Sequence, residues 1–147
     1  MSQFEVSRDD FLISTDPARL DVAAIHQELT RSYWAQGIPL DLVARSLQGS
    51  LCFGLYRESR QIGLARVITD RATYAYLCDV YVRQEFRGQG LGRWLMETVM
   101  NHSDLSGLRR FSLVTRDAHG LYSPLGFGGL SQPERHMEIV RPGPYQR

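Results

Sequence analysis

Apolar residues recur along the chain at two different periods, and these periods predict where helices and strands lie. Between Arg19 and Trp34 the apolar positions stand three or four residues apart, which is the spacing of an amphipathic helix. They are Val22, Ile25, Leu29 and Tyr33. Asp16-Pro17 just before this stretch suits a helix entry, because Asp is a good N-cap and Pro fits the first helical position.

Three further stretches have helical character. Leu40–Leu47 predicts a shorter helix that ends at Gln48-Gly49. A helix is also expected from about Gly90 to His102, and its apolar stripe consists of Leu91, Trp94, Leu95 and Val99. The run "DAHGLYSPLGF" predicts a short helix or turn before a proline-containing bend.

Runs rich in β-branched and aromatic residues predict the strands. Two of these runs are separated only by the polar pair Ser59-Arg60, which indicates a hairpin. The expected strands are Phe11–Asp16, Ser50–Glu58, Gln61–Asp70, Thr73–Val82 and Arg110–Thr115, with Phe127–Leu130 and Arg135–Val140 as a closing pair. This order of elements predicts a mixed sheet covered by helices, an α/β or α+β layered fold.

Length and composition narrow the classes of protein. With 147 residues, 43% of them apolar, the chain is expected to be a single globular domain. A formal net charge of +1 does not favour a nucleic-acid partner. No run is long and apolar enough for a membrane span, and the first ten residues lack a signal-peptide core. Cys52 and Cys78 are expected to be buried reduced thiols, so the expected location is the cytoplasm.

The segment Arg87-Gly88-Gln89-Gly90-Leu91-Gly92 lies between an expected strand and an expected helix. Alternate glycines permit positive φ and let a ligand approach the main chain, and the helix start offers unpaired N–H groups to an anion. Arg83, Arg87 and Arg93 can add contacts to phosphate oxygens. The segment matches neither the Walker P-loop, which requires a Lys, nor the G-x-G-x-x-G dinucleotide fingerprint.

The same segment resembles the R/Q-x-x-G-x-G/A signature of the GNAT superfamily of N-acetyltransferases. A second resemblance lies in "LYSPLGF", which is similar to the L-Y-x-x-x-G-F element of that family. Both motifs and the strand order agree over about residues 10–141. The resemblance implies a GNAT-like fold, with a mixed, mostly antiparallel twisted sheet of about six to seven strands and about four helices.

The resemblance also implies an acetyl-CoA-dependent transfer of an acetyl group to a primary amine of a small molecule or peptide. In such a site the strand residues Val80, Tyr81 and Val82 would meet the pantetheine arm through their main chain, which amounts to adding a strand. The pyrophosphate would meet the residues Arg87, Gly88, Gln89, Gly90, Leu91, Gly92 and Arg93.

The resemblance makes Tyr122 the candidate general acid for the departing thiolate, although packing beneath Phe127 is the structural alternative. Asp79 is the candidate base, because it stands alone in the apolar run "YAYLCDVYV" and the strand Arg110–Thr115 holds no carboxylate. A structural Asp bonded to nearby backbone is the alternative, with bulk water taking the proton. A backbone N–H near Val80–Val82 can stabilise the oxyanion.

The acceptor pocket implied by the resemblance lies beneath the loop "SYWAQGIPL", so Tyr33, Trp34, Asp79 and His119 are the candidate acceptor-binding residues. No spacing of His or Cys predicts a metal site.

A non-catalytic acetyl-CoA-binding regulatory domain is the alternative function. Neither a nucleic acid nor a membrane is expected as a partner, whereas a homodimer is possible, because small domains with exposed sheet edges often pair.

Overall fold

The structure is a computed structural model, and it describes residues 3–145. Six strands form one sheet in the order β1-β2-β3-β4-β5-β6, in which β5 and β6 are parallel and all other neighbours are antiparallel. The strands are β1 (Glu5–Arg8), β2 (Phe11–Ser14), β3 (Leu51–Arg57), β4 (Arg60–Thr69), β5 (Tyr74–Val82) and β6 (Arg110–Leu113). The α-helices are α1 (Val22–Thr30), α2 (Leu40–Gln48), α3 (Leu91–Met100) and α4 (His119–Tyr122).

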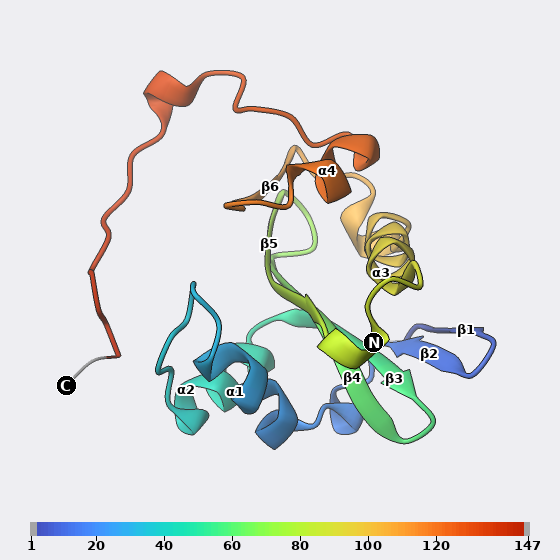
Figure 1. Cartoon of the computed structure of the whole chain (residues 1–147). Helices are drawn as coiled ribbons and strands as arrows, with labels where there is room; N and C mark the ends of the chain where they lie inside the picture. Colours follow the sequence, from blue (N-terminus) through green and yellow to red (C-terminus); the bar gives the residue numbers. More distant parts are fainter. Residues whose placement is uncertain (1–2, 146–147) are drawn as a thin grey trace.

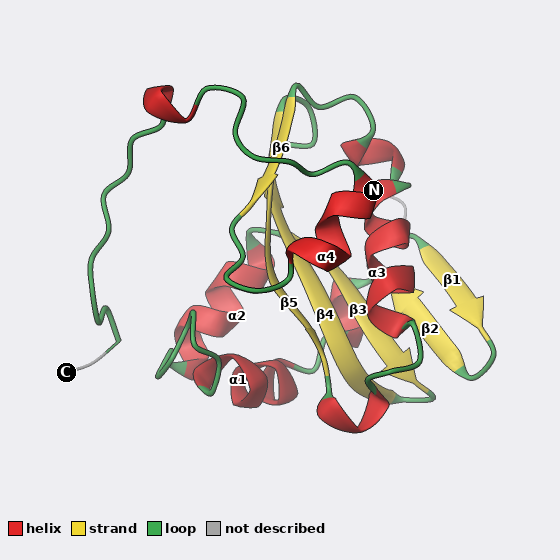
Figure 2. Ribbon diagram, turned by 45° about the horizontal axis from the view of Figure 1, so that its top comes forward, coloured by secondary structure: helices red, strands yellow, loops and turns green. Residues whose placement is uncertain are grey.

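Helices cover both faces of the sheet (Figures 1 and 2). On one face α3 and α4 pack on the central strands, and the apolar side of α3 meets Phe53 and Leu77 there. On the other face α1 and α2 enclose a second cluster with Leu64 and Tyr81 of the sheet. This arrangement confirms the predicted layered fold, with a mostly antiparallel sheet of six strands and four α-helices within the described residues.

The expected helix Arg19–Trp34 is wrong at both ends. The Asp16 side chain caps only a 3-10 turn, Pro17–Arg19, and the α-helix begins after Asp21, whose side chain accepts from the Ala24 N–H. At the other end the Ser32 hydroxyl donates to the Leu29 carbonyl and ends the helix, because short polar side chains compete with backbone hydrogen bonds. Tyr33 and Trp34 therefore lie in the α1–α2 loop.

Two other elements differ from the prediction. Strand β1 was not predicted, because "EVSR" contributes only Val6 to the apolar face and has no alternation to reveal it. The closing strand pair is wrong, since neither Phe127–Leu130 nor Arg135–Val140 pairs with a strand among residues 3–145. Two adjacent glycines interrupt Phe127–Leu130, and the segment Arg135–Val140 extends away from the sheet (Figure 1). Gln146 and Arg147 lie outside the described residues.

Candidate functional site

A β-bulge in β5 is the first feature of the site. Leu64 pairs with Tyr81 and Arg66 pairs with Cys78, so Asp79 and Val80 together oppose the single residue Ala65. Asp79 has φ 52°, which Asp tolerates better than a β-branched residue would. A bulge leaves backbone groups unpaired and bends its strand. It also reverses the alternation of side chains, so that Leu77 and Val80 both pack toward α3 while Tyr81 packs toward α1 and α2.

The two parallel strands separate beyond this bulge. Strands β5 and β6 pair only from Tyr74 with Arg110 to Leu77 with Leu113, although β5 continues to Val82. Within the described residues the second half of β5 thus has no strand beside it on the β6 side. A cavity of about 350 Å³ opens at this divergence, between Val80 of β5 and Val114 just after β6. A free strand edge of this kind can hydrogen-bond an extended ligand that carries amide groups.

The glycine turn lies directly after this free edge. Gly88 and Gly90 have φ 82° and 79°, values that L side chains rarely adopt, and Gly90 is the N-cap of α3 without any side-chain cap. The first N–H groups of α3 consequently lack intrahelical partners, and the positive end of the helix dipole faces outward. The turn is also held to the strand, because Arg87 Nε donates to the Val82 carbonyl at 2.9 Å. Such a turn is suited to a phosphate.

The remaining residues predicted for this turn contribute in different ways. The Gln89 side chain donates to the Phe86 carbonyl at 3.3 Å and closes the turn. Leu91 is buried against the core, so only its backbone is available to a ligand. Arg93 is exposed and its Nε lies 3.4 Å from Glu97 Oε1, an i,i+4 pair that a stronger anion can displace.

Tyr122 also lines the cavity. It ends the single turn of α4, its side chain is buried, and its ring meets Phe127 edge-on with centroids 6.1 Å apart. Burial raises the pKa of its phenol, which makes loss of the proton still less favourable than in a free tyrosine. Tyr122 thus both packs against Phe127 and lines the cavity.

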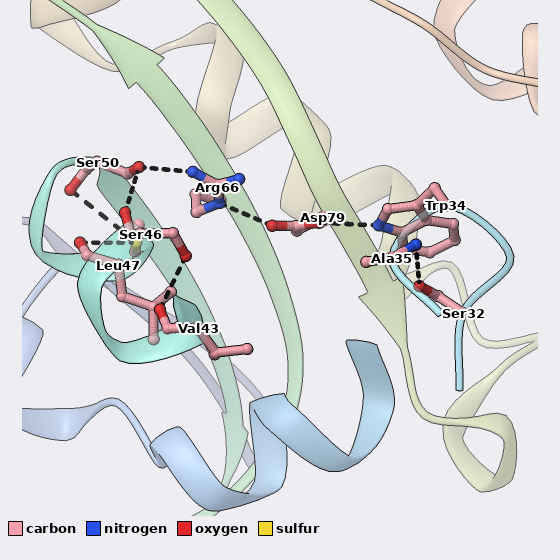
Figure 3. Close-up of polar contacts among 10 residues, drawn as sticks. Ser32, Trp34, Ala35, Val43, Ser46, Leu47, Ser50, Arg66 and Asp79 are labelled. Atoms are coloured by element: carbon pink, nitrogen blue, oxygen red, sulfur yellow. Dashed lines mark hydrogen bonds and ion pairs between the residues drawn. The ribbon is translucent and has the colours of Figure 1, made fainter. Parts of the chain in front are cut away.

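The Asp79 carboxylate accepts hydrogen bonds on both of its oxygens (Figure 3). Trp34 Nε1 donates to Oδ1 at 2.8 Å and Arg66 Nε donates to Oδ2 at 2.7 Å. Arg66 in turn donates from Nη1 to the Ser50 hydroxyl at 3.0 Å. Asp79 is only 8% exposed, and this network supplies the partners that a buried charge requires.

Arg66 was not predicted to be part of the site. It stands in the otherwise apolar run "IGLARVI", and a single Arg in a strand buried on both faces indicates an ion pair. That signal was present in the sequence, but the identity of the partner was not. The register that brings Arg66 opposite Cys78, one residue from Asp79, is fixed by the bulge.

The α1–α2 loop reaches across the cavity to the segment after β6. The Arg116 guanidinium lies 3.8 Å from the centre of the Tyr33 ring, and the Arg116 N–H donates to the Tyr33 hydroxyl at 3.4 Å. Tyr33 and Trp34 contact each other edge-on, with ring centroids 5.0 Å apart. Both aromatic residues line the cavity, together with Asp79, Val80 and Tyr122.

His119 is the predicted site residue that the structure places elsewhere. It begins α4, is exposed, and lines a different groove along the outer edge of β6. Tyr122 also borders that groove, but it is buried and lines the cavity as well, whereas His119 does not. The structure therefore brings together Tyr33, Trp34, Asp79, Val80 and Tyr122 but not His119.

Both cysteines are free, and burial raises the pKa of each thiol to about 12. Among residues 3–145 no group of three His, Cys, Asp or Glu side chains is arranged to hold a metal ion. Over the same residues no helix has the length and apolar character needed to cross a membrane.

Comparison with known proteins gives a consistent result. Residues 19–127 match the Acetyltransferase (GNAT) family. A Gibberella zeae protein whose name assigns it provisionally as an acetyltransferase is 40% identical over 139 residues, covering 79% of this chain and 77% of that protein. A crystal structure from Xanthomonas campestris pv. campestris, described provisionally as a GNAT-family acetyltransferase, is 50% identical with a TM-score of 0.91 and covers 93% of this chain and 97% of that one.

A more distant structure shares the fold alone. Glucosamine-6-phosphate N-acetyltransferase from Arabidopsis thaliana is 14% identical, with a TM-score of 0.58 over 95% of this chain and 96% of that chain. The glycine turn after a strand that separates from its parallel neighbour, the family match and the two relatives of 40% and 50% identity all point the same way. The chain therefore belongs to the GNAT family and is an acyltransferase of the acetyltransferase class.

Proposed function

We propose that this protein transfers an acetyl group directly from acetyl-CoA to a primary amine of a small molecule or peptide. The observation that carries the proposal is the free edge of β5, which leads from the cavity at Val80 to the uncapped start of α3 at Gly90. One continuous path thus offers main-chain groups to an amide-bearing arm and then a helix start to a pyrophosphate.

The residues along this path suit acetyl-CoA as the co-substrate. The backbone of Val80, Tyr81 and Val82 would hold the pantetheine arm, whereas the Tyr81 side chain is buried on the opposite face and takes no part. The backbone from Gly88 to Gly92 would hold the pyrophosphate. Arg87 and Arg93 lie at the two ends of this turn and can contribute charge-assisted hydrogen bonds.

In the proposed reaction the amine nitrogen attacks the thioester carbonyl carbon, and the carbon–sulfur bond then breaks. The bulge leaves backbone groups unpaired beside the cavity, and we assign the Val80 N–H to the developing oxyanion. Tyr122 donates its phenolic proton to the departing thiolate. Burial raises the pKa of this phenol, so it holds its proton until the thiolate forms, and the resulting phenolate then takes up a proton from water.

We assign Asp79 the role of a positioning residue. Its two oxygens already accept from Trp34 and Arg66, so taking a proton from the amine would weaken both contacts. Its role is to hold Trp34 and the bulge at the cavity wall, and the proton of the attacking amine passes to water. The acceptor would bind between the aromatic pair Tyr33–Trp34 and β5, where aromatic faces favour apolar or cationic groups. His119 lies outside this cavity and is not part of the proposal.

The first test measures thiol release from acetyl-CoA with a panel of small amines, amino acids and peptides. Gly90→Glu should abolish acetyl-CoA binding, because it places bulk and negative charge where the pyrophosphate would lie. Gly107→Glu is the matched control, since Gly107 lies in open space in the loop after α3, whereas the turn precedes this helix. Equal acetyl-CoA affinity in a folded Gly90→Glu variant would disprove the assignment of the glycine turn. Binding without turnover on any acceptor would instead favour a regulatory acetyl-CoA-binding domain.

The second test concerns the acid. Tyr122→Phe should lower kcat by about 100-fold or more, with little change in acetyl-CoA affinity, as expected for loss of a general acid. Tyr56→Phe is the matched control, because the Tyr56 hydroxyl is buried without a partner among the described residues and lies outside the cavity. An unchanged kcat in Tyr122→Phe would show that Tyr122 takes no part in the chemistry.

We also propose a cytoplasmic location, which agrees with the two free thiols.

A further inference from the structure

Residues 131–145 form an arm that contains a strand-like segment, and this segment pairs with no strand among residues 3–145. After the 3-10 turn Pro133–Arg135 the backbone is extended and runs away from the sheet toward the α1–α2 loop (Figures 1 and 2). Its apolar side chains are among the most exposed in the structure. Met137 is 96% exposed, Ile139 81% and Val140 67%.

The outer edge of β6 is the matching unpaired element. Strand β6 pairs only with β5, and its other side has no strand beside it within residues 3–145. A groove of about 700 Å³ runs along this edge, and its wall includes every residue from Arg109 to Thr115 and from Gly126 to Ser131. Its floor holds half-buried Phe111 and Leu113, and Val114 at its end is 82% exposed. An unpaired edge beside an apolar groove is a template for another strand.

We propose that residues 136–140 of one copy of this chain pair with β6 of a second copy, and that the two copies exchange their arms about a two-fold axis. Each copy offers the outer edge of β6 and an apolar extended segment that pairs with no strand among residues 3–145, so a reciprocal exchange satisfies both at once. The sheet of each copy gains a seventh strand in this way.

The arm is directed away from its own β6 edge. At its start His136 Nε2 lies 3.1 Å from Arg110 Nη1, at the first residue of β6. At its end Tyr145 packs against Gly37 of the α1–α2 loop, where a Cβ built on Gly37 would lie 3.8 Å from the Tyr145 Cβ. The segment between these two contacts bows outward (Figure 1). A second copy can therefore reach a stretch of chain that the arm's own body leaves uncovered.

The side-chain pattern of the arm fits the groove. Met137 and Ile139 lie on one side of an extended strand and Glu138 on the other. Along β6, Phe111 and Leu113 face the apolar core while Arg110 and Ser112 face the other way. Seating Met137 and Ile139 over Phe111 and Leu113 leaves Glu138 on the side of Arg110, which pairs opposite charges across the strands.

The test is the mass of the full chain in solution, measured by light scattering on size-exclusion chromatography over a range of concentrations. We expect twice the 16.8 kDa of one chain. The double variant Met137→Asp/Ile139→Asp should raise the dimer dissociation constant by about 100-fold or more, because buried apolar anchors dominate such interfaces. Leu40→Asp, which changes an equally apolar exposed residue on α2, should leave the mass unchanged.

Amide hydrogen exchange of the same samples locates the contact. The amides of residues 137–140 should be protected in the dimer and exchange freely in the double variant. A monomer at all concentrations, whether or not these amides are protected, would overturn the proposal, and protection would then mean pairing within one chain. A dimer that the double variant leaves intact would overturn it too. The measurement needs no turnover, so its outcome is independent of the proposed acetyl transfer.

Discussion

The hydrogen bond from Trp34 to Asp79 provides a quantitative test of how the cavity wall is built. Trp34→Phe retains an aromatic ring but removes the Nε1–H that donates to Asp79 Oδ1 at 2.8 Å. A hydrogen bond to a charged group contributes about 1.5–3 kcal/mol to stability. Asp79 is 8% exposed but Trp34 is 45% exposed, so water can partly replace the lost donor. We therefore expect the coupling between the two side chains to be about 1.5 kcal/mol, at the low end of that range.

A double-mutant cycle isolates this coupling from the other consequences of each substitution. Trp34→Phe also alters the edge-on contact with Tyr33, and Asp79→Ala leaves Arg66 without its partner, which costs about 3–5 kcal/mol. Both effects occur on two opposite sides of the cycle and cancel. The loss in Asp79→Ala is compatible with a folded chain, because domains of this size are stable by about 5–15 kcal/mol.

The assay is urea unfolding of the four proteins, followed by circular dichroism and evaluated at constant m-value. We expect Trp34→Phe to lower the free energy of unfolding clearly in the natural background and by about 1.5 kcal/mol less when Asp79 is Ala. Additivity within about 0.5 kcal/mol would show that the two side chains are not coupled and would refute the proposed anchoring of the loop. The KM for the acceptor should rise in parallel with the loss of coupling, since Trp34 lines the cavity.

Three further predictions concern other parts of the molecule. Gly90→Ala should lower the free energy of unfolding by about 1–2 kcal/mol, because φ at this position is 79°. Gly92→Ala, inside α3, should leave the free energy of unfolding unchanged or raise it by up to about 1 kcal/mol. Thermal unfolding of the two variants tests both predictions. His102 Nδ1 accepts from the Asp104 N–H, and burial lowers the pKa of His102 in the folded chain. Below about pH 6.5 the unfolded state therefore binds more protons than the folded state. As the pH is lowered through this range, the free energy of unfolding should fall by at most about 1.4 kcal/mol per pH unit. Urea unfolding at several pH values should show a shallower decline in His102→Asn, and an equal decline would exclude His102 as its source. With thiol pKa values of about 12, Cys52 and Cys78 should react with iodoacetamide at pH 8 roughly 1,000-fold more slowly in the folded chain than after unfolding, and rapid labelling of the folded protein would contradict this.

Most of the fold followed from local patterns in the sequence. The hairpin of β3 and β4, the aromatic strand β5 and the stripe of α3 have periods that depend on neighbours a few residues away, so the sequence alone revealed them. The sequence-based predictions were wrong where a side-chain hydrogen bond, or the lack of a neighbouring strand among residues 3–145, outweighed the local spacing of apolar residues. A serine hydroxyl ended α1 early, and residues 135–140, despite their strand-like pattern, pair with no strand in the described part of the chain.

The same division holds for the site. The glycine turn is local, because alternate glycines before an apolar helical stripe already predict positive φ and an uncapped helix start, and Gly88 and Gly90 have that conformation. The role of Asp79 was not local. Its partners Arg66 and Trp34 lie 13 and 45 positions away, and the bulge that turns the carboxylate toward them depends on how β4 and β5 pair. The sequence by itself determined which turn can bind an anion, whereas only the tertiary structure decided that the lone carboxylate of β5 is anchored by two donors.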